Sequence, residues 1–281
     1  MAVSANDAST RDVVHAAKDR PAHEVVVVLL FGPLARALVR VLLPLRVPPP
    51  AVVLANVAAG FAGVVALGSG QLVLAAVLLQ VKTVLDNADG LLARASGRVT
   101  LLGRYLDTEA DLLVNAALFA ALGVSTGNPW LALAAFLAVT AVLSSGFNLA
   151  HLQREARGRA LPAPVRSGSA VERALESGYR TLYAPQDRLL RAFSTRRLER
   201  ALAGVADPVA RRGAELAYHD GRTLSYLANT GLSTQLLALG ACLVAGAPTA
   251  YLWLAVAALL PLPVLQLRRE ALARRALRSA A

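Results

Sequence analysis

The sequence contains very few cysteines, aromatic residues and lysines. Cys242 is its single cysteine, which excludes an intrachain disulfide and disfavours a metal site built on thiolates. Aromatic residues make up 5% of the chain, and Lys18 and Lys82 are the only lysines. The first 20 residues lack the basic start, apolar middle and small-residue cleavage site of a signal peptide, so residues 1–22 are expected to form a mobile cytoplasmic tail.

Aliphatic residues and arginine take the place of these scarce types. The chain is 56% hydrophobic with a mean hydropathy of +0.52, which is too apolar for an ordinary soluble domain and typical of helices packed in lipid. Its formal net charge of +11 is carried almost entirely by arginine. Because no recognised nucleic-acid-binding motif accompanies that charge, we expect no nucleic-acid partner and predict that the arginines face anionic lipid in cytoplasmic loops.

Six apolar segments approach the length of about 20 residues that a helix needs to cross a bilayer. They cover residues 51–69, 71–92, 106–123, 130–150, 224–246 and 249–267. Three of the turns between them, at 68–71, 125–129 and 245–248, contain no lysine or arginine, whereas the opposite ends of the segments are rich in arginine. The positive-inside rule therefore predicts an all-α integral membrane protein with six transmembrane helices and both termini cytoplasmic.

Two further segments do not fit this pattern. Residues 23–47 are expected to form a juxtamembrane amphipathic helix at the interface, because Gly32 and Pro33 interrupt their apolar run; a seventh span is the alternative. The arginine-rich residues 151–222 are expected to form short helices on the membrane surface or a solvated linker. The chain would then consist of a catalytic half at 48–150 and a final pair of spans with a basic tail at 223–281.

Four aspartates at the junction of two apolar segments are the main functional signal. Asp86 and Asp89 close one segment, and Asp107 and Asp111 open the next. Spacings of three and four residues place each pair on one face of its helix. Carboxylates are costly beside a bilayer, and hard oxygen ligands suit Mg²⁺ or Mn²⁺, so we predict a site for one or two such ions. The alternative is a set of interfacial charges that merely flank the spans.

The residues around the aspartates suit a ligand that carries phosphate. Gly90 and Ala93 lack bulk at the same helix end, and Arg94 supplies positive charge. Lys82 lies one helical turn before Asp86, and we expect it to be a buried ion-pair partner of that residue rather than a catalytic group.

Together these residues form the pattern D-x2-D-G-x2-A-R-x8-G-x3-D-x3-D, which occupies Asp86, Asp89, Gly90, Ala93, Arg94, Gly103, Asp107 and Asp111. The pattern resembles the signature of the CDP-alcohol phosphatidyltransferases (CDP-alcohol phosphotransferases) at all eight fixed positions. The resemblance implies a homodimeric membrane enzyme with a cytoplasm-facing site for two divalent cations, held by the four aspartates. It also implies that Asp111 is the general base. The CDP part of the donor would be contacted by Gly90, Ala93, Arg94, Thr100 and Gly103. Family members often open the first span with Pro-Asn; here Asn56 is the candidate for that contact.

The predicted reaction moves a phosphatidyl group from a CDP-alcohol such as CDP-diacylglycerol to a small alcohol or phosphorylated alcohol, and it releases CMP. This reaction belongs to phospholipid biosynthesis, and the resemblance implies that it takes place at the inner cell membrane. Two alternatives remain: a transporter or channel, and a non-catalytic scaffold of the same fold. The first is disfavoured by aspartates at the span ends rather than near the bilayer midplane, and the second by the presence of all four acids.

The sequence leaves the acceptor open among inositol phosphate, glycerol phosphate, serine and other sugar alcohols. Inositol phosphate is disfavoured, because the basic pair that relatives using it carry at the end of the fourth span is absent or displaced here. His151 and His219 are expected to be surface histidines. The candidates for acceptor binding are Arg154, Arg157 and Arg222, followed by Asn148, Gln153, Asn229 and Gln235.

Overall fold

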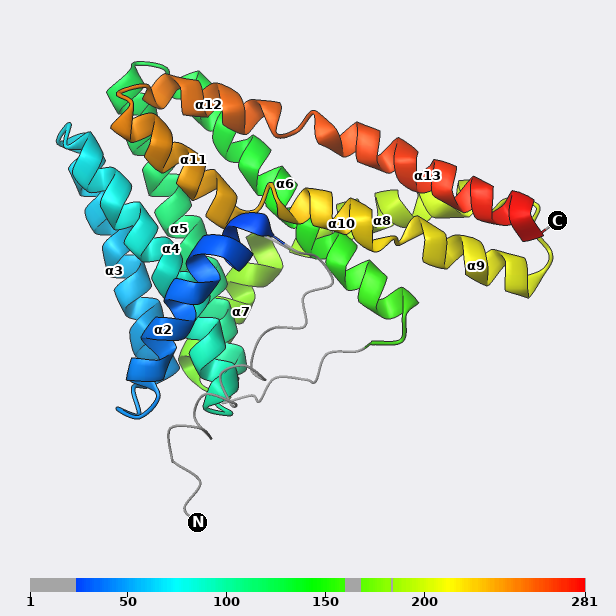
Figure 1. Cartoon of the computed structure of the whole chain (residues 1–281), viewed down its shortest axis with the longest axis horizontal. Coiled ribbons are helices and arrows are strands. Elements are labelled where there is room, and N and C mark those ends of the chain that lie inside the picture. The colour runs from blue at the N-terminus through cyan, green and yellow to red at the C-terminus, as the bar shows by residue number, and fades with distance from the viewer. Residues whose placement is uncertain (1–23, 160–167, 183, 281) are drawn as a thin grey trace, which may run out of the picture.

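The computed structural model describes residues 24–159, 168–182 and 184–280, and the regular elements of these ranges are all helices (Figure 1). This confirms the all-α prediction. The tail predicted at residues 1–22 lies outside the described residues.

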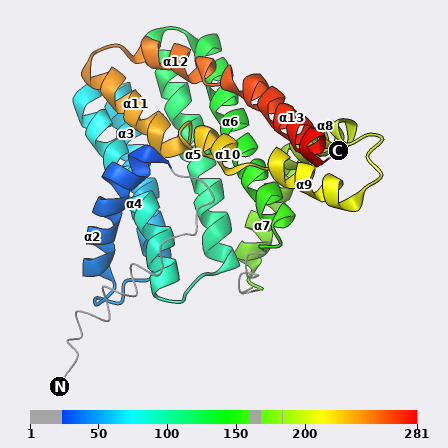
Figure 2. The ribbon, with the colours of Figure 1, turned by 45° about the vertical axis from the view of Figure 1, so that its right-hand side comes forward.

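The first described helices are the π-helix η1 (Val27–Phe31) and α2 (Gly32–Leu42). Pro33 has no N–H to donate to the preceding turn, and the chain responds with a wider turn in which the Gly32 N–H bonds to the Val27 carbonyl. Ala35 and Val39 of α2 are buried against Ala88, Leu91 and Leu92 near the C-terminal end of α4. The predicted N-terminal helix therefore forms, and it lies alongside α4 (Figure 2).

Four long helices follow, joined by short turns. They are α3 (Pro49–Gly68), α4 (Leu72–Ala95), α5 (Leu101–Thr126) and α6 (Pro129–Ala156). Alanines alternate with leucines in the core that these helices share with α11 and α12, so their backbones approach closely. α5 begins at Leu101, earlier than predicted, because the Thr100 side chain caps it by accepting a hydrogen bond from the Gly103 N–H at 3.1 Å. Both aspartate pairs consequently lie inside helices.

The contact between α3 and α5 depends on Gly60. A Cβ atom at this position would lie 2.6 Å from Val114 Cγ1 and 3.4 Å from Lys82 Cδ. We expect Gly60→Ala to lower the free energy of unfolding by about 1–3 kcal/mol, because the added methyl group forces the helices apart. The thermal midpoint of the purified protein measures this loss. Gly68→Ala on the same helix is the control, since a Cβ there meets nothing within 4 Å, and equal midpoints for the two variants would contradict the prediction.

The predicted polar stretch at 151–222 contains the end of α6 and three further helices. These are α7 (Ala170–Leu182), α8 (Ala184–Ala201) and α9 (Pro208–Tyr218). The helices α8 and α9 pack against the C-terminal helix through a small core, and the Arg269 guanidinium lies 3.9 Å from the centre of the Tyr218 ring. The prediction of short helices is thus confirmed, but α8 and α9 form a packed unit with α13 beside the main bundle (Figure 1).

The last two predicted spans are each broken into two helices. Residues 224–246 become α10 (Gly221–Ala228) and α11 (Leu232–Val244), with a break at which a Cβ on Gly231 would lie 2.8 Å from the Ala228 carbonyl oxygen. Residues 249–267 become α12 (Pro248–Ala257) and α13 (Pro261–Ala280). Pro261 cannot donate the hydrogen bond that would continue α12, so the helix is interrupted there.

Five helical runs in the described residues are long and apolar enough to cross a membrane: Pro49–Gly68, Leu101–Thr126, Pro129–Ala156, Pro208–Val244 and Pro248–Ser279. This supports an integral membrane protein. The six spans predicted from the sequence include α4 as well, which is 24 residues long but carries Lys82 and two of the aspartates.

Candidate active site

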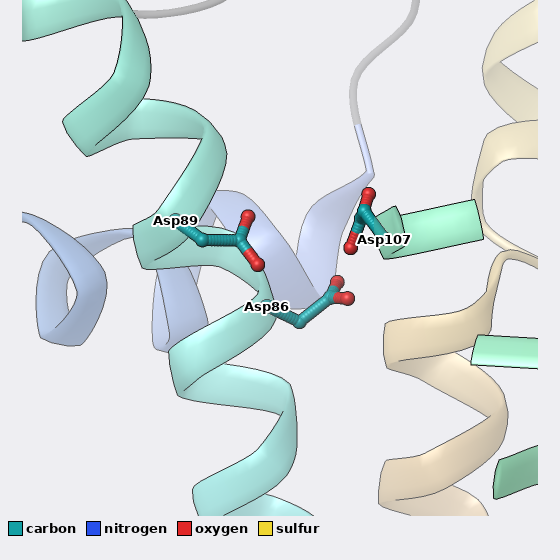
Figure 3. Close-up of side chains that lie close together, drawn as sticks. All are labelled: Asp86, Asp89 and Asp107. Atoms are coloured by element: carbon teal, nitrogen blue, oxygen red, sulfur yellow. The ribbon is translucent and has the colours of Figure 1, made fainter. Parts of the chain in front are cut away.

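Three of the four aspartates converge where α4 and α5 face each other (Figure 3). Asp86 and Asp89 project from successive turns of α4, and Asp107 comes from α5. One ligand oxygen from each lies within 4.8 Å of the others. Carboxylates brought this close repel one another unless a cation or a proton lies between them. The arrangement therefore has the donor set of a site for a hard divalent cation.

The surroundings of these carboxylates fit a metal ion. Asp89 Oδ2 is buried and accepts no hydrogen bond from the described residues, which leaves a buried charged oxygen for a ligand outside the protein. Asn56 donates from Nδ2 to Asp86 Oδ1 at 3.4 Å and orients that carboxylate. A metal held by oxygen ligands commonly has such second partners behind the ligands.

Asp111 is bound by Lys82 instead of joining the group of three. Lys82 Nζ lies 2.7 Å from Asp111 Oδ1, and the lysine side chain is 1% exposed whereas that of Asp111 is 22% exposed. The predicted role of Lys82 as a buried ion-pair partner is confirmed. The predicted partner was wrong: the lysine reaches across to α5 rather than along its own helix to Asp86.

A cavity of about 610 Å³ opens beside the aspartates, between α5, α6 and the α10–α11 break. Asp86, Asp107 and Asp111 line it, and Arg154 lies on the α6 wall. Its far part is apolar and is bordered by Phe119 and Phe136. A ligand in this cavity would therefore meet charged groups at one end and hydrocarbon at the other.

The segment that contains the eight-residue pattern also matches a known protein family. Residues 46–169 match the family described as CDP-alcohol phosphatidyltransferase, and this range contains all four aspartates. This segment belongs to the CDP-alcohol phosphatidyltransferase family.

A curated relative lies in the same family. The chain is 33% identical over 96 residues to archaetidylinositol phosphate synthase of Aeropyrum pernix, a match that covers 34% of this chain and 45% of the relative. The matched part thus spans less than half the length of that relative. No solved structure matches this chain. The matched segment and the apolar helices are those of a multi-pass membrane protein.

The five predicted contacts for the CDP part of the donor lie at the adjoining ends of α4 and α5. A Cβ on Gly90 would lie 3.2 Å from an Arg94 terminal nitrogen, so the guanidinium folds back over the bare backbone of Gly90. Ala93 is partly exposed beside them. Thr100 and Gly103 are bonded to each other in the cap of α5, which gives Thr100 a structural role. None of these five residues lines the cavity.

The acceptor candidates divide into one residue on the cavity and several away from it. Arg154 lines the cavity, and its Nε is buried and donates no hydrogen bond within the described residues. Arg157 and Arg222 are exposed and do not line the cavity. Asn148 donates to Asp187 Oδ1 at 2.8 Å and thereby joins α6 to α8. The remaining candidates also lie off the cavity wall: Gln153, Asn229 and Gln235.

The two histidines differ in their surroundings. His151 is 48% exposed and lies 3.2 Å from Glu155, as expected of a surface histidine. His219 is 7% exposed and contacts both the Tyr218 ring and the Arg269 guanidinium, so the prediction of a surface position was wrong for it. Its burial follows from the packing of α9 on α13, which the local sequence does not reveal.

Sequence reasoning missed two buried polar residues of the cavity wall. Asn115 lies one turn beyond Asp111 on α5, and Ser144 lies on α6. The spacing of four residues from Asp107 to Asp111 to Asn115 was a usable signal for the first. No sequence pattern marks Ser144, because its place depends on how α6 packs against α5.

Proposed function

We propose that this protein transfers a phosphatidyl group from a CDP-linked lipid such as CDP-diacylglycerol to a hydroxyl of a small alcohol and releases CMP. The convergence of Asp86, Asp89 and Asp107 within the family's eight-residue pattern carries this proposal. The site faces the cytoplasm of a six-span protein with both termini inside, and the working form is a homodimer in the inner membrane. The arginine distribution supports this orientation.

The four aspartates have two roles in the proposed reaction. Asp86, Asp89 and Asp107, assisted by Asp111, would hold one or two Mg²⁺ or Mn²⁺ ions. When bound, these ions neutralise charge on the pyrophosphate and on the leaving CMP. Arg94 binds the donor phosphates over the bare backbone of Gly90, where no side chain intervenes.

Asp111 is the proposed general base. Lys82 donates a hydrogen bond to Oδ1 of this carboxylate and thereby fixes its orientation. Asp111 takes the proton from the acceptor hydroxyl while the hydroxyl oxygen attacks the lipid-bearing phosphorus. The bond from that phosphorus to the bridging oxygen breaks, and CMP leaves with the bridging oxygen.

We propose a phosphorylated alcohol as the acceptor. The observation that favours it is Arg154, whose buried Nε faces no partner in the described residues and which lines the same cavity as the aspartates. A phosphate group fits the fork geometry of a guanidinium. The relative named archaetidylinositol phosphate synthase supports inositol phosphate as the first acceptor to test, with glycerol phosphate next.

The decisive experiment supplies the purified protein with CDP-diacylglycerol, Mg²⁺ or Mn²⁺, and a panel of alcohols. The panel contains inositol phosphate, glycerol phosphate, inositol, glycerol and serine. Release of CMP together with a new phospholipid from one acceptor is the expected result. If no acceptor yields CMP with either metal, the proposed function is wrong.

Removing divalent cations is expected to stop CMP release completely, because the aspartate carboxylates cannot bind the pyrophosphate without them. The measurement compares CMP release in EDTA with release after Mg²⁺ or Mn²⁺ is added back. Asp89→Asn should bind Mn²⁺ more weakly than the wild type in a direct binding titration. Full activity in EDTA would contradict the metal assignment.

A further inference from the structure

We propose that the cleft between α5 and α6 binds the lipid part of the donor. In this arrangement Asn115 and Ser144 bind the oxygens of its glycerol backbone, and the apolar cleft beyond Phe119 and Phe136 holds one of its hydrocarbon chains. This inference rests on the proposed function and adds to it the place and the recognition of the lipid.

Two contacts show which residues of α5 lie opposite which residues of α6. A Cβ on Gly123 would lie 3.2 Å from Ala132 Cβ, and the rings of Phe119 and Phe136 meet edge to face at 5.8 Å. Moving four residues toward the N-terminus of α5 corresponds to moving four residues toward the C-terminus of α6, as expected for antiparallel helices. Continuing these steps places Thr140 level with Asn115 and Ser144 level with Asp111.

Asn115 and Ser144 are polar but uncharged, and they lie on successive levels of the cleft: Ser144 opposite Asp111, and Asn115 one turn further from the aspartates. Asn115 is 8% exposed and Ser144 is 7% exposed, and both line the cavity. Within the described residues neither side chain makes a hydrogen bond, whereas the neighbouring Thr140 hydroxyl donates to the Phe136 carbonyl. Both side chains line the cavity, so their amide and hydroxyl groups are available to a ligand there, and uncharged oxygens suit such partners.

The cleft becomes apolar one turn further along α5. Phe119 and Phe136 border both the main cavity and a second one of about 590 Å³, whose walls also include Ala116, Ala120, Gly123, Val124, Ala132 and Leu133. Val124 and Leu133 are exposed, so this second cavity is open at the side from which a chain could enter from the bilayer.

The order of chemical groups along the cleft is that of a phospholipid. Along the cleft the aspartates and Ser144 come first, Asn115 and Thr140 follow one turn further, and apolar side chains lie beyond them. The nine-residue rise from Asn115 to Val124 is about 14 Å, close to the ~15 Å of one hydrocarbon leaflet. A donor whose phosphate is held at the aspartates would therefore present its glycerol oxygens to Asn115 and its chain to the second cavity.

The test of the hydrocarbon site uses Ala120→Phe, which fills the second cavity, and donors with either six-carbon or eighteen-carbon chains. We expect kcat/KM for the long-chain donor to fall at least about tenfold and the value for the short-chain donor to stay unchanged. Ala58→Phe, on the exposed face of α3 and outside both cavities, is the matched control. Equal effects on both donors, or no effect on either, would overturn the proposal.

The test of the backbone site uses Asn115→Leu. We expect a higher KM for the donor, an unchanged KM for the acceptor, and a thermal midpoint that does not fall, because the Asn115 side chain makes no hydrogen bond within the described residues. Ser125→Ala, at the exposed outer end of the same helix, should leave both KM values unchanged. A higher KM for the acceptor alone would assign Asn115 to the acceptor and overturn this part, and a lower thermal midpoint would assign it a structural role. If the wild type releases no CMP with any donor, the proposed function itself fails, which separates the two results.

Discussion

Replacing Asp111 with Asn is expected to slow CMP release by about 10²–10⁴-fold, because an amide cannot accept the proton of the acceptor hydroxyl. The structure supports this role in two ways. Asp111 lines the cavity proposed to hold the acceptor, and it is not one of the three carboxylates that converge at the proposed metal site. Its ion pair with Lys82 holds the carboxylate in one orientation.

The same substitution has a second expected effect, on stability. Asp111→Asn leaves Lys82 buried without its carboxylate partner, so the thermal midpoint should fall as well. CMP release and the thermal midpoint are therefore measured on the same preparation. Glu109→Gln, two residues away on α5, makes the same chemical change at a carboxylate that faces α7 and should retain wild-type turnover. Wild-type turnover in Asp111→Asn would rule out the assignment of the base.

Replacing Lys82 with Met is the second substitution with a large expected effect. The lysine is 1% exposed and supplies the ammonium that faces Asp111 at 2.7 Å. Methionine keeps the length of the side chain but removes its charge, so the carboxylates of α4 and α5 repel one another without compensation. We expect a loss of about 3 kcal/mol in the free energy of unfolding, measured in EDTA so that no metal ion replaces the missing charge.

The double variant Lys82→Met/Asp111→Asn separates charge pairing from chemistry. With both charges removed, no buried charge is left unpaired, so the double variant should be more stable than either single variant. It should nevertheless remain inactive, since it lacks the base. If the loss of stability in the double variant equals the sum of the two single losses, the ion pair does not stabilise the fold. If the double variant is active, Asp111 is not the base.

The sequence by itself determined the helices and the chemistry of the site. Aliphatic segments without internal charge predict long helices, because backbone polar groups must be satisfied within each segment in lipid. The aspartates were found from spacing alone, since residues three or four apart share a helix face whatever the rest of the fold does. Thr100 shows the limit of this reasoning: a side chain assigned to the donor also caps α5, which moves the start of that helix.

Only the tertiary structure decided which of these residues meet. Lys82 pairs with Asp111 because Gly60 lets α3, α4 and α5 pack closely enough for the lysine to cross to the next helix. His219 is buried because α9 packs on α13, more than 40 residues further along the chain. Asn115 and Ser144 line the same cavity only through the alignment of α5 with α6. Side-chain spacing within one helix is fixed by local geometry, whereas contacts between helices depend on packing that no single segment encodes.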